Sequence, residues 1–361
     1  MHGLPGETKM KLRTGWAIAL TLLCGAQAAE ACSCVIVQRG CGPLEVPGDA
    51  VFLGTVVSKE VGFGLRPDGL ISSVVPSRVR FAVTDAFRGV SGKEIEIETT
   101  EGCCACGYPF EVGRAYLVYA HLHEGKLKTS SCSWTVPAVL GAATIQQYRA
   151  KRAGITAPSL FGLVTRVPQD ARIEGLGSHT PVAGITMRIR GNAGMEFTSS
   201  TSIDGVYEFR SLPPDTYELE PLLPATLTTR ERATQKAVRV TIENAKTCEQ
   251  NVQVFADGVI SGQAVTPAGE PLEGFLTIEP ADAAEREAAR KRGGLPGFET
   301  GADGRFELSL LWPGKYRLKF MPKIGGMVRF DDPAFYPDVI SLGEGQHVTG
   351  LRFVVGLSGR E

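Results

Sequence analysis

The amino-acid sequence predicts an exported all-β protein built from several modules, and three observations support that prediction. Short apolar and aromatic stretches alternate with turn residues along the 361-residue chain, which contains 43 Gly and 22 Pro. This spacing is typical of strands joined by tight turns. Cysteines gather in the first half of the chain, and the second half repeats its own pattern at a constant interval. We therefore expect a cysteine-rich β module followed by two related β-sandwiches.

Composition and charge narrow the class of partner. Hydrophobic residues make up 43% of the chain and charged residues 21%, values that suit folded globular modules. Lys and Arg total 38 against 39 Asp and Glu, so the formal net charge is −1. Nucleic acids and anionic membranes are usually bound through a basic surface. The composition thus predicts neither as a partner.

Residues 1–31 have the organisation of a signal peptide. Basic residues within positions 9–13 precede an apolar stretch at 15–25, which is too short to cross a bilayer core of about 30 Å. Small residues then permit cleavage after Ala28 or after Ala31. No later stretch is long and apolar enough to span a membrane. The expected location is secreted, periplasmic or cell-surface.

Cysteine count and export together predict a disulfide framework. Nine cysteines are present, and removal of Cys24 with the signal leaves an even set. In an oxidising compartment such a set is expected to form disulfides. The eight candidates are Cys32, Cys34, Cys41, Cys103, Cys104, Cys106, Cys132 and Cys248.

The first module shows four strand-like stretches and one helix. Runs rich in aliphatic, aromatic and β-branched residues predict strands at 50–58, 77–86, 94–99 and 115–122. Apolar residues near helical spacing, with a basic end, predict a helix over 139–152. A short linker at 154–158 follows.

The remainder of the chain is an internal repeat. Asp204-Gly205-Val206-Tyr207-Glu208-Phe209 matches Asp303-Gly304-Arg305-Phe306-Glu307-Leu308, and Tyr217 matches Tyr316, each pair lying 99 positions apart. Solenoid repeats are much shorter, so this period indicates two whole domains in tandem. The Asp-Gly pair supplies a turn, and the alternating residues after it predict a strand. The second copy carries an insertion at 281–292 that we expect to form a surface helix.

The repeat resembles the carboxypeptidase regulatory-like domain, a transthyretin-like β-sandwich. The resemblance rests on Pro-Val-Ala-Gly at 181–184, on Asp-Gly-x-Tyr-x-Phe at 204–209 and on Leu-Pro-Pro-x-x-Tyr at 212–217, with counterparts in the second copy. It implies two sandwiches, at 159–254 and 256–357.

The first module, residues 32–155, resembles the netrin-like family and especially the tissue inhibitors of metalloproteinases. The matching features are Cys32-Ser33-Cys34, Phe52-x-Gly54, and Cys106-Gly107 followed by an aromatic strand and Cys132. The resemblance implies an OB-like barrel with a C-terminal helix, and disulfides Cys32–Cys106 and Cys34–Cys132. It leaves Cys41 to pair with Cys103 or Cys104, and the remaining cysteine to pair with Cys248 or stay free.

This resemblance also suggests one activity. If the signal is cleaved after Ala31, Cys32 carries a free α-amine beside a carbonyl, which could complete the open position of a metalloprotease zinc site. Ser33 would then enter the specificity pocket of that protease. The alternative hypothesis is therefore a metalloprotease inhibitor. Otherwise Cys32 only ties the N-terminus to the barrel.

Other candidate sites favour structural roles. Cys103-Cys104-x-Cys106 lacks the spacing of a zinc site and is expected to form disulfides, and His121 and His123 are expected to be surface residues. The Asp-Gly pairs lack the acidic ligands of a calcium loop and are expected to be turns. The sequence contains no recognisable nucleophile, metal or phosphate motif. We predict no enzyme activity, no cofactor and no metal.

Aromatic residues of the last domain offer the best binding candidates. Trp312 follows the strand of the repeat, and Phe335 and Tyr336 stand in a Gly- and Pro-rich segment. Exposed aromatic rings stack on sugars or anchor protein partners, although these rings could equally close the sandwich core. The favoured function is non-catalytic contact with an extracellular protein or a glycan.

Overall fold

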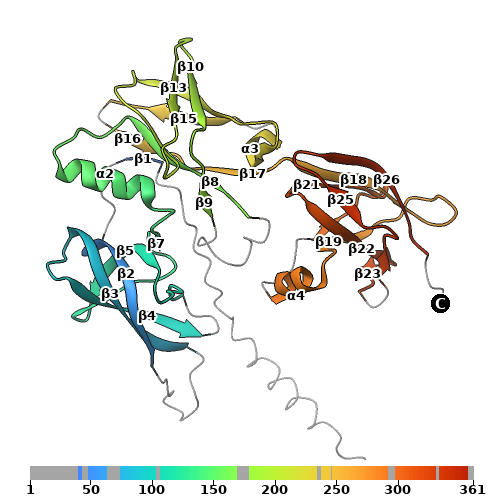
Figure 1. Cartoon of the computed structure of the whole chain (residues 1–361), viewed down its shortest axis with the longest axis horizontal. Helices are drawn as coiled ribbons and strands as arrows, with labels where there is room; N and C mark the ends of the chain where they lie inside the picture. Colours follow the sequence, from blue (N-terminus) through green and yellow to red (C-terminus); the bar gives the residue numbers. More distant parts are fainter. Residues whose placement is uncertain are drawn as a thin grey trace, which may run out of the picture.

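The computed structural model confirms an all-β protein of several modules (Figure 1). It describes residues 40–42, 48–62, 74–102, 106–168, 179–233, 237–244, 246–291, 297–330 and 333–356. The expected signal peptide lies outside these ranges. Along the chain, a barrel is followed by sandwich 1 and sandwich 2, our names for the sheets built on β8 (Leu160–Arg166) and on β18 (Gly258–Val265).

The first module is a closed barrel. Its strands are β2 (Ala50–Val61), β3 (Val74–Arg88), β4 (Glu94–Gly102), β5 (Ala115–His123), β6 (Lys126–Lys128) and β7 (Val136–Pro137). They pair in the order β2-β3-β4-β6-β5-β7, and β2 also pairs with β5, which closes the sheet on itself. Closure leaves a single interior, and Phe52, Phe81 and Phe110 fill it with rings 5.4 and 5.1 Å apart, edge to face. The first module is thus a closed β-barrel, and its OB-like identity remains a prediction.

A helix, α2 (Ala142–Arg152), follows the barrel. It begins three residues later than the sequence suggested, because residues 138–141 form turns that end at the N-cap Gly141. Ile145 and Tyr148 pack on the outside of the barrel against Val51, Leu117 and Tyr119. The helix is therefore part of the barrel module, and it also faces sandwich 1 (Figure 1).

Sandwich 1 consists of two sheets around one core. The larger sheet contains β1 (Gly40–Gly42), β16 (Thr247–Glu249), β8, β17 (Val252–Ala256), β14 (Leu227–Thr229), β12 (Val206–Phe209) and β9 (Thr180–Pro181). The smaller sheet runs β11 (Glu196–Ser200), β10 (Thr186–Gly191), β13 (Asp215–Leu222) and β15 (Val238–Ile242). A one-turn helix, α3 (Arg230–Ala233), follows β14. Alternate residues of these strands face inward, so Met187, Ile189, Tyr217 and Val254 are fully buried between the sheets.

Sandwich 2 repeats this plan with fewer strands in one sheet. That sheet runs β21 (Arg305–Leu311), β18 and β26 (His347–Val354). The other contains β20 (Gly297–Glu299), β19 (Gly274–Pro280), β22 (Gly314–Ile324), β23 (Met327–Val328), β24 (Ala334–Phe335) and β25 (Ile340–Leu342). The insertion forms α4 (Ala283–Lys291), as expected. Leu276, Leu318, Phe320 and Phe353 are fully buried in the core.

The repeated motifs have the same structure in both copies. Gly205 and Gly304 both adopt a φ of +72°, which confirms that the Asp-Gly pairs are turns. The hydroxyl of Tyr217 donates to the carbonyl of Pro213, and that of Tyr316 donates to the carbonyl of Trp312. Each tyrosine thus fixes the corner four residues before it, a device also found in immunoglobulin-type sandwiches. This bond explains why the aromatic residue recurs at a fixed distance from the proline corner.

One short segment lies where the sequence did not place it. Residues 40–42 fall inside the first predicted module, but β1 pairs antiparallel with β16 of sandwich 1. Cys41 lies opposite Cys248 in that pairing and forms a disulfide with it. The chain therefore contacts sandwich 1 before it enters the barrel at β2.

Candidate binding groove and module junctions

The cysteines are paired differently from the expected scheme in one respect. Cys41 bonds to Cys248, 207 positions away, and not to Cys103 or Cys104. Antiparallel pairing of β1 with β16 brings the two thiols together, which no local spacing reveals. Cys106 and Cys132 are also disulfide-bonded. Their bridges to Cys32 and Cys34 remain predictions, because those two residues, like Ser33, Cys103 and Cys104, lie outside the described residues.

Trp312, expected to bind a ligand or close the core, instead lies at the junction of the two sandwiches. Its indole Nε1–H donates to the carbonyl of Val167 at 3.1 Å, and the guanidinium of Arg166 lies 3.8 Å from the ring centroid. The ring is half-buried under this cation. Only Asp257 separates β17 from β18, so the corner of sandwich 2 is held against the end of β8. Trp312 therefore joins modules rather than presenting a binding face.

The other aromatic candidates do not converge on one site. Tyr336 packs edge to face on Phe353 at 5.4 Å and belongs to the core of sandwich 2. Phe335 is 50% exposed, with Arg317 5.8 Å from its ring. Phe330 is 66% exposed and contacts Phe275. Of the predicted binding residues, only Phe335 is thus available to a partner.

The histidine pair of β5 lies on the surface, as expected. His121 and His123 are both exposed, and His123 has Glu124 3.8 Å away. Within the described ranges, no group of three or more His, Cys, Asp or Glu side chains is arranged to hold a metal ion. No helix among those residues is long and apolar enough to cross a membrane.

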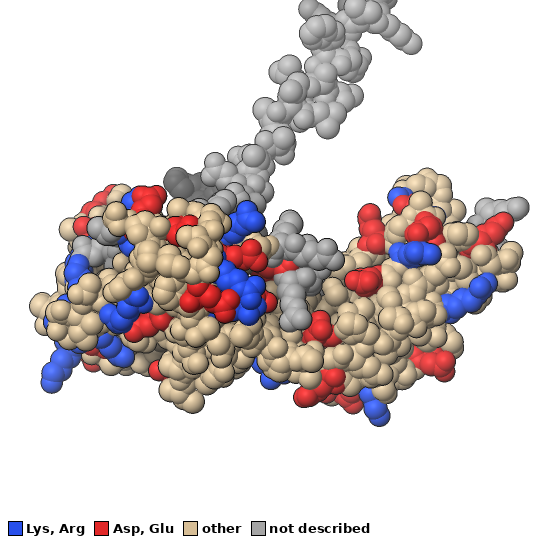
Figure 2. Space-filling model, turned by 90° about the horizontal axis from the view of Figure 1, so that it is seen from above, with Lys and Arg blue, Asp and Glu red and all other residues tan. Residues whose placement is uncertain are grey.

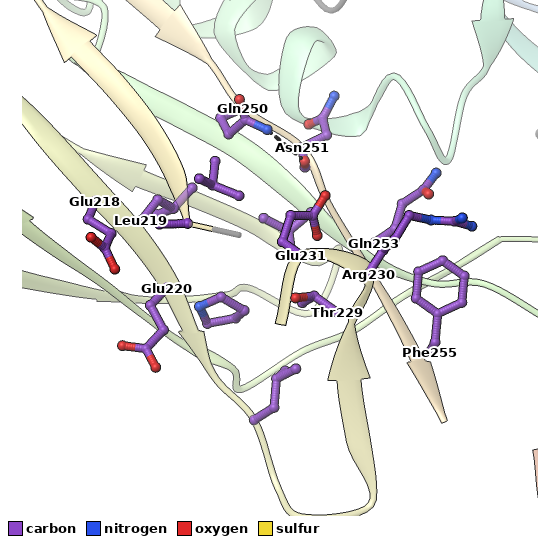
Figure 3. Close-up of a pocket in the computed structure, with 15 residues that line it drawn as sticks. Glu218, Leu219, Glu220, Thr229, Arg230, Glu231, Gln250, Asn251, Gln253 and Phe255 are labelled. Atoms are coloured by element: carbon purple, nitrogen blue, oxygen red, sulfur yellow. Dashed lines mark hydrogen bonds between the residues drawn. The ribbon is translucent and has the colours of Figure 1, made fainter. Parts of the chain in front are cut away.

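One concave site among the described residues is a groove in sandwich 1, which we call the β13–β17 groove. It has a volume of about 460 Å³, within the range of small-ligand sites. It opens where the two sheets diverge, between β13 and β15 on one side and β14, α3 and β17 on the other (Figure 3). Its lining comprises Glu218, Leu219, Glu220, Pro221, Leu223, Thr229, Arg230, Glu231, Ala237, Val238, Gln250, Asn251, Val252, Gln253 and Phe255. The sequence gives no signal for it, because the lining comes from four separate stretches that carry no common motif.

The groove has an apolar floor and a polar rim. Leu219 and Val252 of the floor belong to the core of sandwich 1. The rim carries carboxylates of Glu218, Glu220 and Glu231, together with side-chain amides such as that of Gln253. Glu220 is paired with Arg188 on the neighbouring strand. The rim therefore offers mainly hydrogen-bond acceptors beside apolar surface.

One cation and one aromatic ring close the other end of the groove. The guanidinium of Arg230 lies 5.5 Å from the ring centroid of Phe255 (Figure 3). Arg230 begins α3, and Phe255 lies on β17 opposite Thr228 of β14. Acidic side chains outnumber basic ones in the lining. A neutral or cationic ligand suits these charges better than a polyanion.

Charges elsewhere on the visible surface are mixed. Figure 2 shows acidic and basic side chains interspersed over this face of the molecule. Sandwich 1 carries exposed ion pairs, such as Arg190 with Glu196. Such exposed pairs contribute little stability.

The barrel and sandwich 1 are joined through α2. One side of the helix region, with Leu140, Ala142 and Ala143, packs on Phe161, Leu163 and Val206 of sandwich 1. Thr144 donates to Glu249 and Gln147 donates to Glu208, at 3.3 and 3.4 Å. Because Ile145 and Tyr148 of the same helix pack on the barrel, α2 is held from both sides.

Ion pairs hold the C-terminal end of α2 on the barrel. Asp85 of β3 accepts hydrogen bonds from Arg149 and Arg152, at 2.7 and 2.8 Å. Burial alone would raise the pKa of Asp85, but the two guanidinium groups outweigh that effect and hold its pKa below the usual range. The charged form of Asp85 therefore stabilises the folded state.

We expect Asp85→Asn to lower the free energy of unfolding by about 1 kcal/mol at neutral pH, since the arginines are half exposed. Because the folded pKa lies below the unfolded value of about 3.9, the contribution is complete above that pH and is lost as the pH falls through the folded pKa. Urea unfolding of the wild type and variant between neutral pH and pH about 3 measures it. The difference in free energy of unfolding between the wild type and Asp85→Asn should shrink as the pH falls. Glu344→Gln, an exposed substitution on sandwich 2, should not change the free energy of unfolding at neutral pH.

Comparisons with known proteins identify no family. No family model matches the chain, and no curated protein matches it. The family resemblances of both regions therefore remain predictions.

Among solved structures, the chain is similar to the minor pilin GBS52 of Streptococcus agalactiae, with 13% identity, 56% of this chain and 97% of that chain covered, and a TM-score of 0.22. It is similar to the shaft pilin SpaA of Lactobacillus rhamnosus GG, with 10% identity, coverages of 56% and 98%, and a TM-score of 0.21. It is also similar to the TIE protein of Bacillus anthracis, with 12% identity, 88% of this chain covered and a TM-score of 0.25; there the match spans 56% of the longer protein. Scores this low carry no conclusion about function.

Proposed function

We propose that this protein is an exported, non-catalytic binding protein that holds a carbohydrate in the β13–β17 groove of sandwich 1. The observation that carries the proposal is the groove itself, with an apolar floor and a rim of carboxylate and amide groups. A sugar ring has the matching chemistry, because its hydroxyls donate hydrogen bonds while its C–H faces pack on apolar surface. Protein contact through other surfaces remains compatible with this role.

The charges of the groove narrow the class of sugar. Glu218 and Glu231 on the rim disfavour sulfated or uronic acid chains, which would bring like charges together. Neutral sugars and amino sugars avoid this repulsion. Phe255 is only 8% exposed beneath Arg230, so the Arg230 side chain, and not the ring, bounds this end of the groove.

Two features support an extracellular architectural role. The Cys41–Cys248 disulfide is typical of proteins exposed to an oxidising compartment. The contacts of α2 and of Trp312 hold the modules to one another instead of leaving them on free linkers. A linked array of this kind presents the groove at a defined distance from the barrel.

A glycan array with the mature protein tests the proposal. We expect binding to neutral or amino sugars, and a loss of about tenfold in affinity for Gln253→Ala, whose amide lies on the rim. Gln263→Ala, the same change on sandwich 2 and outside the groove, is the matched control and should bind normally. Absence of binding to every glycan, or equal binding by Gln253→Ala and the wild type, would overturn the proposal.

A further inference from the structure

The two sandwiches differ at one edge, and the difference can be traced residue by residue. In sandwich 1, Leu160 of β8 pairs with Phe209 on one side and with Cys248 on the other. In sandwich 2, Ile260 of β18 pairs with Leu308 and with Val348. Phe209 and Leu308 are matching positions of the repeat. Strand β26 is therefore the counterpart of β16 and β17 together.

Both halves of this edge are covered in sandwich 1. Strand β1 pairs antiparallel with β16, fixed by the Cys41–Cys248 disulfide. Strand β14 pairs antiparallel with β17, with Thr228 opposite Phe255. Neither backbone edge is left open, which is how soluble proteins commonly protect long strands.

The same edge is open in sandwich 2. The sheet order is β21-β18-β26, and among the described residues no strand pairs with the free side of β26. The sequence counterpart of β14 is β23, 99 positions later, but it turns back on β22 through Gly325 and Gly326, both at positive φ. β26 therefore presents eight residues of unpaired edge.

The bulge in β26 does not block this edge. Gly350 has a φ of +73°, and a side chain added there would contact nothing within 4 Å. The pairing with β18 shifts at this point, between Ile260 and Gly262. In sandwich 1 the corresponding break separates β16 from β17, and a strand is docked on each side of it. An irregularity at this place is thus compatible with added strands.

We propose that the free edge of β26 is an interface between two copies of this chain, joined by antiparallel pairing of β26 with β26 across a two-fold axis. When the axis passes between Gly350 and Leu351, Arg352 of one strand faces Thr349 of the partner subunit. In this register Arg352, the one formally charged residue of β26, does not lie opposite Arg352 of the partner subunit. Like charges directly opposite each other would be unfavourable. Val354, which is 50% exposed, is partly covered by the pairing.

The backbone geometry identifies a position for a test. The N–H of Val355 donates to Val265 of β18, so by strand alternation the N–H of Val354 points toward the free side. Val354→Pro removes that donor without removing a bond to β18. Val354→Ala keeps the donor and is the matched control.

Sedimentation of the mature full-length protein over a range of concentrations tests the proposal, which is independent of the proposed sugar site. We expect a monomer–dimer equilibrium, at least tenfold weaker for Val354→Pro and little changed for Val354→Ala. Hydrogen exchange of wild-type residues 347–354 should slow as the dimer forms, and it decides the question if the proline variant does not fold. A monomer at every concentration, a dimer equally strong in Val354→Pro, or exchange independent of concentration would each overturn it.

Discussion

Removing the Cys41–Cys248 disulfide is expected to lower the free energy of unfolding of sandwich 1 by about 2–5 kcal/mol. The bond joins residues 207 positions apart, so it restricts the unfolded chain strongly. It also holds β1, which is only three residues long, on the edge of β16. A strand this short contributes few hydrogen bonds and would leave the edge once the covalent link is lost.

The two cysteines differ in solvent exposure, so each needs a different replacement. Cys41 is exposed and tolerates serine, whereas Cys248 is 1% exposed, so alanine avoids burying an unpaired hydroxyl there. Urea unfolding of Cys41→Ser with Cys248→Ala, followed by circular dichroism, measures the loss. Serine at Cys41 alone should give a similar loss, because either change breaks the bond. Equal stability of the double variant and the wild type would show that β1 is held by other contacts.

Local patterns predicted four of the six barrel strands, β2 to β5. Residues 50–58 and 115–122 were expected to be strands and lie within β2 and β5, because their aliphatic and aromatic residues fill a barrel interior. The helix expected at 139–152 forms from Ala142, since the turns before it are set by contacts with the barrel. The repeat predicted identical corners, and Gly205 and Gly304 show them. Each of these features depends on neighbours in the sequence.

The features without a local sequence signal depend on distant segments of the chain. Cys41 has no local signal for Cys248, because their pairing follows from the docking of β1 on sandwich 1. Trp312 is of a residue type that often binds ligands, but in the structure its ring contacts Arg166 of the other sandwich. The β13–β17 groove likewise combines side chains from strands that are adjacent only in the fold. One distant contact does have a signal in the repeat, and it lies on the face of sandwich 1 that α2 covers.

The residues on that face differ between the two sandwiches, and the difference agrees with the presence of α2 on sandwich 1 alone. Phe161 and Leu163 pair with Glu208 and Val206, and they are buried under the α2 region. Ser261 and Gln263 occupy the matching positions of sandwich 2, opposite Glu307 and Arg305. Apolar side chains thus occur in the copy that receives the helix, and polar ones in the copy that does not. The residues at these two positions therefore indicate which sandwich contacts the barrel module.

Exchanging these residues should therefore separate the barrel from sandwich 1. For Phe161→Ser with Leu163→Gln, we expect the interface to lose about 3–5 kcal/mol, because a large buried ring is removed and an amide is placed against Ala143. Ile145 and Tyr148 would keep α2 on the barrel, so the modules should unfold in two calorimetric transitions instead of one, and X-ray scattering should report a larger radius of gyration. Met187→Ala, a cavity in the core of sandwich 1 away from this face, should destabilise the sandwich without changing the radius. If the exchange leaves the two modules unfolding together at the original radius, the apolar face is not what holds them, and the hydrogen bonds of Thr144 and Gln147 or the Cys41–Cys248 link must do so.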